Sequence, residues 1–240
     1  MMMQYVFRFA GVIKNDFLFQ TRHGFYILYL VIVVMYALIL NWMPEVLKLH
    51  VLPELLFIEV ALLGYIFVGA ILLLEKDQKL IEYLFVTTLS IQEYIISKAL
   101  TLMVLSVIVG FGITFFAVGI SFYPGLLAAA ILLGSLFYTM LGIALGVRAK
   151  RLNGYILLSF PVLFAAVIPM VAAVADVKSI IFYFFPGYGV ALLLRGALSG
   201  ISGFDLAYSI CSTILCITAS GVIAWRQMQQ YVLKTIGGAA

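Results

Sequence analysis

Residues Leu55–Leu74 read LLFIEVALLGYIFVGAILLL and contain one charged residue, Glu59. A helix of about 20 mostly apolar residues is what crosses the hydrocarbon core of a bilayer. The rest of the chain agrees, because 65% of its 240 residues are hydrophobic, 10% are charged and the mean hydropathy is +1.21. Water-soluble domains are about half apolar and a quarter charged. The sequence therefore predicts an all-α polytopic membrane protein, since membrane barrels show short alternating segments instead.

Apolar runs of this length predict six transmembrane helices in a single transmembrane domain, residues 1–240. The runs are Phe25–Met43, Leu55–Leu74, Ala99–Tyr123, Gly125–Val147, Tyr155–Ala175 and Leu206–Trp225. With a cytoplasmic N-terminus, eleven of the 14 Lys and Arg residues fall in inner segments, and three fall in outer ones (Lys48, Lys178 and Arg195). Because Lys and Arg concentrate in cytoplasmic loops, we expect a multi-pass protein of the cell membrane with both termini in the cytoplasm.

The segment before the first span, residues 4–22, reads as an amphipathic helix. One face carries Tyr5, Phe9, Val12, Ile13 and Phe17, and the other carries Gln4, Arg8, Gly11, Asn15 and Arg22. Such a helix lies in the membrane interface with its basic residues toward anionic headgroups. A plain cytoplasmic leader is the alternative.

The outer segment before the last span, residues 176–204, contains two short apolar runs. Ile180–Phe185 and Val190–Leu198 are separated by Pro186 and Gly187. Neither run is long enough to span a bilayer. We therefore expect two short re-entrant helices that enter the outer leaflet and turn back. A seventh span would instead place Arg226 and Lys234 outside, against the charge bias.

The cytoplasmic loop of residues 75–97 predicts two helices with a break between them. Glu75 and Lys79 have the spacing of a helical ion pair. A set of side chains then lines one face of a short helix: Leu80, Tyr83, Leu84 and Thr87. Ser90 and Glu93 have the spacing of a capping box, which predicts a break at Thr87–Leu89 and a second helix that continues into the third span. This loop suits contact with a soluble partner, although an ordinary capped connector has the same pattern.

Motifs for catalysis and metal binding are missing from the sequence. There is no phosphate-binding G-x-x-x-x-G-K-[ST] motif, and the two histidines, His23 and His50, fall in loops on opposite sides of the membrane. Nothing pairs carboxylates or histidines within a span. No basic cluster indicates nucleic acid as a partner. We expect no catalytic residue, no metal and no cofactor on this chain.

Two features within the spans invite an interpretation. Glu59 is expected to face a dimer interface or the outer helices, near Arg195, because a carboxylate at mid-depth in lipid costs about 2.5–3.5 kcal/mol. Its alternative is a side chain that reaches the outer interface. Gly142 and Gly146 permit close approach of another helix, within the chain or between two copies.

The loop after Leu74 resembles the coupling-helix region of type 2 ATP-binding-cassette (ABC) transporter permeases. The matching residues are Glu75, Lys76, Asp77, Glu82, Leu84, Thr87, Glu93 and Lys98, and the departures are Lys79, Leu80 and Thr88. The resemblance implies that this loop, including Tyr83, couples the chain to a separate ATPase subunit. It also implies a dimer of permeases, with a second copy or a related chain, and ATP and Mg²⁺ on the partner ATPase.

Two shorter motifs resemble bacterial permeases for fluoroquinolone export. They are Arg22–Tyr26 with Tyr29, and Phe185–Gly189. This resemblance implies export of a hydrophobic or amphipathic compound, and the candidates for its path or outer gate are Glu59, Phe185, Tyr188 and Arg195. A secondary transporter or channel without an ATPase is the alternative, and a membrane-embedded enzyme is a third reading. The scarcity of His, Asp and Glu in the spans and the lack of inverted repeats disfavour these two.

Overall fold

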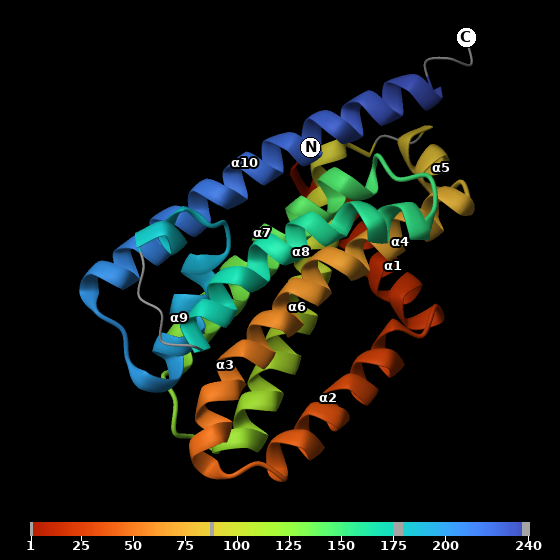
Figure 1. Ribbon diagram of the computed structural model, residues 1–240. Helices are drawn as coiled ribbons and strands as arrows, with labels where there is room; N and C mark the ends of the chain where they lie inside the picture. Colours follow the sequence, from red (N-terminus) through yellow and green to blue (C-terminus); the bar gives the residue numbers. More distant parts are fainter. Residues whose placement is uncertain (1, 87–88, 175–179, 237–240) are drawn as a thin grey trace.

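The computed structural model describes residues 2–86, 89–174 and 180–236. Every regular element within these ranges is helical (Figure 1), which confirms the all-α prediction. The elements are α1 (Met2–Arg22), α2 (Phe25–Asn41), α3 (Glu45–Ala61), the π-helix η1 (Leu62–Phe67), α4 (Val68–Asp77), α5 (Leu80–Val86), α6 (Ile91–Val118), α7 (Pro124–Gly146), α8 (Leu152–Val174), the 3₁₀-helix η2 (Ile180–Phe184), α9 (Tyr188–Ser199) and α10 (Gly203–Ile236).

Within the described residues, four helical stretches are long and apolar enough to cross a membrane. They are Glu45–Asp77, Ile91–Val118, Pro124–Gly146 and Gly203–Lys234. The pair Arg8–Arg22 and Phe25–Asn41, bent by 65°, makes a fifth if it is one broken span. The membrane protein class is confirmed. Helices α2 and α8 cover the other two predicted spans, and the count of six stays a prediction.

Helix α7 forms the centre of the bundle, in contact with α6, η1, α4, α9 and α10. Its glycines make this packing possible. A Cβ on Gly142 would lie 2.7 Å from the carbonyl oxygen of Tyr65, and one on Gly146 would lie 3.4 Å from Cα of Gly69. The two glycines therefore pack against η1 and α4 of the same chain. Of the two alternatives, packing within one chain or between two copies, this is the first.

The second span differs from its prediction at both the start and the middle. Its helix begins at Glu45, ten residues before the apolar run, and includes Pro53. The π-helix Leu62–Phe67 then interrupts the α-helical hydrogen bonding between α3 and α4. A π-helical turn contains more residues than an α-helical turn and often accompanies a functional site. Neither feature has a local sequence pattern that predicts it.

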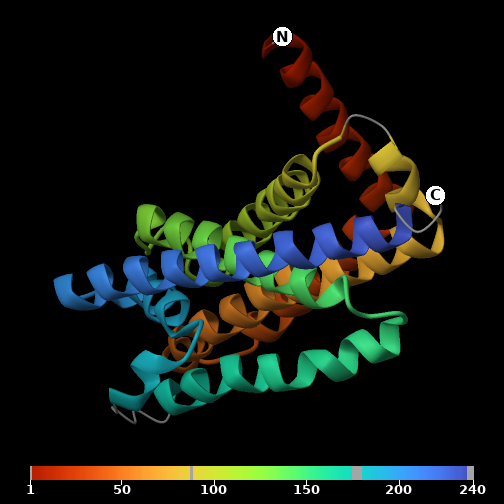
Figure 2. The same ribbon diagram turned by 90° about the horizontal axis from the view of Figure 1, so that it is seen from above.

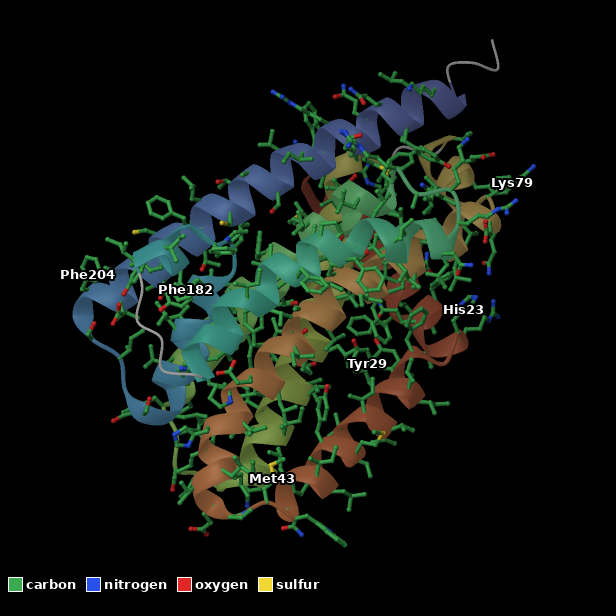
Figure 3. All side chains as sticks on the ribbon, viewed as in Figure 1. His23, Tyr29, Met43, Lys79, Phe182 and Phe204 are labelled. Atoms are coloured by element: carbon green, nitrogen blue, oxygen red, sulfur yellow. The ribbon has the colours of Figure 1, made fainter. Side chains whose placement is uncertain are left out.

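Two groups of elements lie at opposite ends of the bundle. Helix α1, α5 and the C-terminal end of α10 lie at one end, and the α2–α3 turn and the start of α10 lie at the other (Figures 1 and 2). Lys79 and His23 mark the first end, and Phe204 and Met43 mark the second (Figure 3). We call them the cytoplasmic end and the outer end, according to the predicted orientation. Helix α8 lies at the edge of the bundle (Figure 2).

The outer segment contains the two short helices that the sequence predicts, within its described part. Helix η2 ends at Phe184, and α9 starts after Gly187, whose φ of 92° is the left-handed conformation that favours glycine. Helix α9 packs against α3, α7 and α10. Residues 176–179 of the predicted segment lie outside the described residues.

Candidate functional site

Within its described residues, the loop of residues 75–97 folds as a short helix between two longer ones. Helix α4 ends at Asp77, and Lys79, with φ of 56°, reverses the chain before α5. The hydroxyl of Ser90 accepts a 3.2 Å hydrogen bond from the backbone N–H of Glu93, and the Glu93 carboxylate accepts one of 2.8 Å from the N–H of Ser90. The predicted capping box is therefore confirmed, and it starts α6. Thr87 and Thr88 lie outside the described residues.

Helix α5 packs on the bundle through one side and presents the other to the surroundings. Ile81 is buried, and the ring of Phe85 lies 5.7 Å from that of Tyr94 on α6. Tyr83 and Val86 are 69% and 76% exposed. Glu82 and Leu84 are half-buried. The side of α5 that carries Tyr83 is thus accessible to a partner at the cytoplasmic end.

The base of this loop is held by a buried cluster of charges, which we call the junction cluster: Asp16, Glu75 and Lys98. The ammonium of Lys98 donates to the carboxylates of both Asp16 on α1 and Glu75 on α4. Ser97 donates to the other oxygen of Asp16, and the Tyr94 hydroxyl donates to Glu75 at 2.5 Å. The three charged residues are 1–6% exposed. The cluster joins α1, α4 and α6 at one point.

The predicted ion pair of Glu75 with Lys79 is wrong, because Glu75 faces the bundle and Lys79 lies beyond the end of α4. Removal of one partner from a buried ion pair leaves an uncompensated charge, which is strongly destabilising. Helix α4 therefore keeps its position through Lys98, a residue on another helix.

Polar contacts also hold α1 along the first turns of α6. Arg8 donates to the Glu93 carboxylate at 2.6 Å, and Gln20 donates to the Thr101 hydroxyl at 3.0 Å. The sequence predicts that Arg8 faces lipid headgroups, and in the structure its guanidinium also has a partner on α6, the Glu93 carboxylate. The helix itself is confirmed. It packs through a polar seam that the apolar pattern did not indicate.

Lys76 ties the same region to α7 and α10. Its ammonium donates to the carbonyl oxygens of Gly146, Val147 and Ala149 at 3.1, 2.6 and 3.2 Å. Gly146 is the last residue of α7 and the other two residues follow it, so the cation also complements the dipole of that helix. The ammonium lies 4.6 Å from the ring centroid of Tyr231 on α10. Asp77, the next residue, is exposed.

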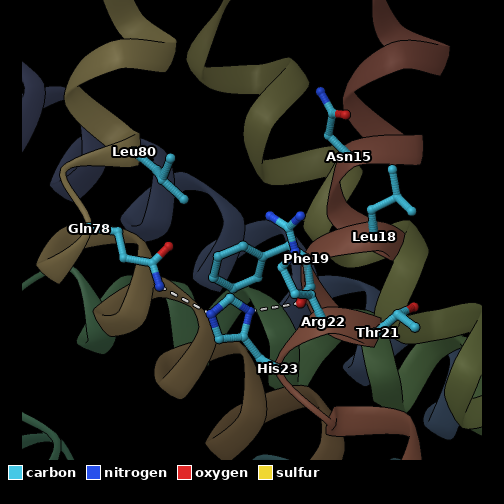
Figure 4. A pocket seen from close by; sticks show the side chains of 8 residues that line it. All are labelled: Asn15, Leu18, Phe19, Thr21, Arg22, His23, Gln78 and Leu80. Carbon is cyan, nitrogen blue, oxygen red and sulfur yellow. Dashed lines mark hydrogen bonds between the residues drawn. The ribbon is translucent and has the colours of Figure 1, made fainter.

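A pocket of about 640 Å³ lies beside this region, between the end of α1 and the start of α5 (Figure 4). His23 bridges its two sides, with Nδ1 donating to the Phe19 carbonyl at 2.9 Å and Nε2 accepting from the Gln78 amide at 3.1 Å. Arg22 also lines the pocket. The described residues contain no group of His, Cys, Asp and Glu that is arranged to hold a metal ion.

The four residues predicted to line the substrate path or the outer gate do not form one site. Arg195 on α9 donates two hydrogen bonds to the carboxylate of Glu54, one of them 2.9 Å long. Arg195 therefore pairs with Glu54, and the expectation that Glu59 lies near Arg195 is wrong. Glu59 is 2% exposed, and neither carboxylate oxygen has a hydrogen-bond partner among the described residues. Glu59 attracts attention in the sequence because it is a charged residue within an apolar run. In the structure its side chain is buried between helices of the same chain.

Phe185 and Tyr188 belong to an aromatic cluster at the outer end. The ring of Phe182 lies 6.4 Å from that of Phe185 and 6.2 Å from that of Tyr188. Tyr183 packs against Tyr188 and donates to the Asp205 carboxylate at 2.9 Å. This hydrogen bond raises the pKa of Tyr183 to about 12. The cluster joins η2, α9 and the start of α10.

Comparisons with known proteins identify the family. The model of the fluoroquinolones export permease protein family matches residues 7–236. Two proteins from Mycobacterium tuberculosis, of strains CDC 1551 / Oshkosh and ATCC 25618 / H37Rv, are each 26% identical to the chain over 210 residues. The match covers 81% of this chain and 84% of each relative. Both bear the name fluoroquinolones export permease protein. No solved structure matches significantly. The chain belongs to the fluoroquinolones export permease protein family.

Proposed function

We propose that this chain is the membrane-spanning subunit of an exporter driven by a separate ATPase. The exported compound is hydrophobic or amphipathic, and fluoroquinolones are the class that the family and the two relatives carry in their names. The chain moves its substrate out of the cell and performs no chemistry on it.

The observation that carries the proposal is the position of α5. This short helix lies at the cytoplasmic end, exposes Tyr83 and Val86, and is connected at both sides to long apolar helices. The junction cluster lies at its base, where Glu75 lies in the last turn of α4 and Lys98 lies within the first half of α6. A displacement of α5 is therefore transmitted to α4 and α6 together, and to α1 through Asp16.

The residues of the region that resembles a coupling helix thus have two roles in this proposal. Glu75, Lys76 and Lys98 point into the bundle and fix the loop to α1, α6 and α7. Glu82 and Tyr83 lie on α5 and contact the ATPase. Closure of the ATPase around ATP then moves the spans through the buried residues.

The assembly in this proposal contains two permease chains and two ATPase subunits in the cell membrane. The second permease is another copy of this chain, and both termini lie in the cytoplasm. ATP and Mg²⁺ bind to the ATPase subunits and not to this chain.

The test is Glu82→Lys, which reverses a charge on α5 and leaves the spans unchanged. Its matched control is Glu45→Lys, an exposed carboxylate at the outer end. Like charges brought together at an interface cost several kcal/mol, so export and substrate-stimulated ATP hydrolysis in vesicles should fall by about tenfold or more. The control should retain both activities. Equal activity of Glu82→Lys and the control would contradict contact between α5 and an ATPase.

A further inference from the structure

Glu59 and Tyr29 form a pair of unsatisfied polar groups inside the bundle. Glu59 on α3 is 2% exposed and Tyr29 on α2 is 3% exposed. The two carboxylate oxygens and the Tyr29 hydroxyl have no hydrogen-bond partner among the described residues. Tyr29 and Tyr36 lie within electrostatic range of Glu59, and Tyr29 is on the side of α2 that faces the bundle (Figure 3). Buried polar groups are nearly always hydrogen-bonded, so this pair needs an explanation.

No described cation neutralises Glu59. Helices α2 and α7 contain no charged residue. The charged residues of α6 are Glu93 and Lys98, both at its cytoplasmic end, and Lys98 is held in the junction cluster. On α9 the charged residue is Arg195, which bonds to Glu54. Among the described residues, the titratable groups near Glu59 are thus Tyr29 and Tyr36 on α2.

The depth of Glu59 makes an ionised form unfavourable in this conformation. The residue lies about 8 Å along the helix from the midpoint of the apolar run Leu55–Leu74, at about 1.5 Å per residue. The hydrocarbon core extends about 15 Å on each side of its own midpoint. An unpaired carboxylate at that depth is expensive, and a neutral carboxylic acid avoids the cost.

We propose that Glu59 is a membrane-embedded site that holds either a proton or the ammonium group of an exported amine. In the present conformation the carboxyl group is protonated. When α2 separates from α3 and water enters, the proton passes to water and the carboxylate binds the ammonium, with the Tyr29 hydroxyl oxygen as a second acceptor. Reprotonation of Glu59 releases the amine. The inference rests on the proposed export function and names the substrate class that this site selects.

Two features of the fold favour such an opening. The π-helix begins three residues after Glu59, so the backbone beside the site already departs from α-helical hydrogen bonding. Helix α2 carries many exposed apolar side chains, among them Ile27, Leu30 and Leu38 at 70%, 65% and 58%. It contacts α6 more extensively than α3. A movement of α2 away from Glu59 therefore leaves most of the bundle packing intact.

The first test uses dicyclohexylcarbodiimide, which reacts with protonated carboxyl groups in apolar surroundings. Membranes that contain the full chain are treated, and modified carboxyls are located by mass spectrometry. Glu59 should be modified. Glu54, paired with Arg195, and the exposed Glu45 serve as controls on the same helix and should remain unmodified. Norfloxacin, a fluoroquinolone with a basic piperazine, should protect Glu59, and nalidixic acid, a quinolone without a basic amine, should not. An unmodified Glu59, or equal protection by both compounds, would overturn the proposal.

The second test measures export of the same two compounds from vesicles by the chain with its ATPase. Loss of a charge-assisted hydrogen bond costs about 1.5–3 kcal/mol, so Glu59→Gln should lower norfloxacin export by about 10- to 100-fold and leave nalidixic acid export within about twofold. Glu59→Asp should retain part of the norfloxacin export, which separates a charge effect from misfolding. Equal loss for both compounds in Glu59→Gln would refute amine recognition. If the chain exported norfloxacin without its ATPase and Glu59→Gln abolished only that export, the Glu59 site would stand and the proposed energy source would be refuted.

Discussion

Glu59 and Glu75 lie on the same helical stretch, Glu45–Asp77, and are almost equally buried, at 2% and 3% exposed. Their surroundings are opposite. Glu75 accepts hydrogen bonds from Lys98 and Tyr94, whereas Glu59 has no hydrogen-bond partner among the described residues. Burial alone therefore does not define the role of a carboxylate in this protein. The paired carboxylate holds three helices together, and the unpaired one is available to a proton or a ligand.

Breaking the junction cluster should have the largest effect. Lys98→Met leaves the carboxylates of Asp16 and Glu75 buried without their common cation. The free energy of unfolding should fall by about 3–5 kcal/mol, which thermal unfolding of the purified protein in detergent would measure. Lys14→Met removes an exposed lysine of α1 and is the control, with an expected change within about 0.5 kcal/mol. If Lys98→Met were as stable as the unchanged protein, Glu75 would not depend on its ion pair, and it would not differ from Glu59 in this respect.

Breaking the outer ion pair should have an intermediate effect. In Arg195→Met, Glu54 loses both hydrogen bonds from the guanidinium. The Arg195 side chain is 29% exposed, so solvent screens this pair more than the junction cluster. We expect a loss of about 1–2 kcal/mol in the same measurement, smaller at high salt. A loss as large as that of Lys98→Met would show that exposure does not set the strength of these pairs.

Replacing the unpaired carboxylate should have the smallest effect on stability. Glu59→Gln substitutes a neutral amide for a group that is already neutral in this conformation, and it removes no hydrogen bond that the described residues form. The thermal midpoint should stay unchanged or rise slightly, with a change within about 0.5 kcal/mol. A loss comparable to that of Arg195→Met would mean that the Glu59 carboxylate has a stabilising partner, and Glu59 would then resemble Glu75.

Local patterns in the sequence predicted local structure well. The capping box of Ser90 and Glu93, the turn at Gly187 and the amphipathic character of α1 each depend on residues a few positions apart, and each is present. The apolar run lengths likewise predicted the membrane class, because the thickness of the bilayer sets helix length directly.

The partners of the charged residues could not be predicted in the same way. Asp16 and Lys98 meet only through the packing of α1 on α6, and Glu54 meets Arg195 only through the packing of α3 on α9. A signal existed on α1, since Arg8, Asp16 and Gln20 follow helical spacing and form a polar stripe. Without the position of α6, however, this stripe could not be distinguished from a face toward lipid headgroups.

The π-helix Leu62–Phe67 has a consequence for how this chain is compared with its relatives. An α-helix turns about 100° per residue, and wide π-turns absorb one extra residue without rotating the flanking helices. A relative with a regular α-helix there needs one residue fewer to present the same faces on both sides. The matching alignment should then contain a one-residue gap in the middle of a transmembrane helix. Such a gap usually signals an alignment error, but here it would record the insertion that produced the π-helix.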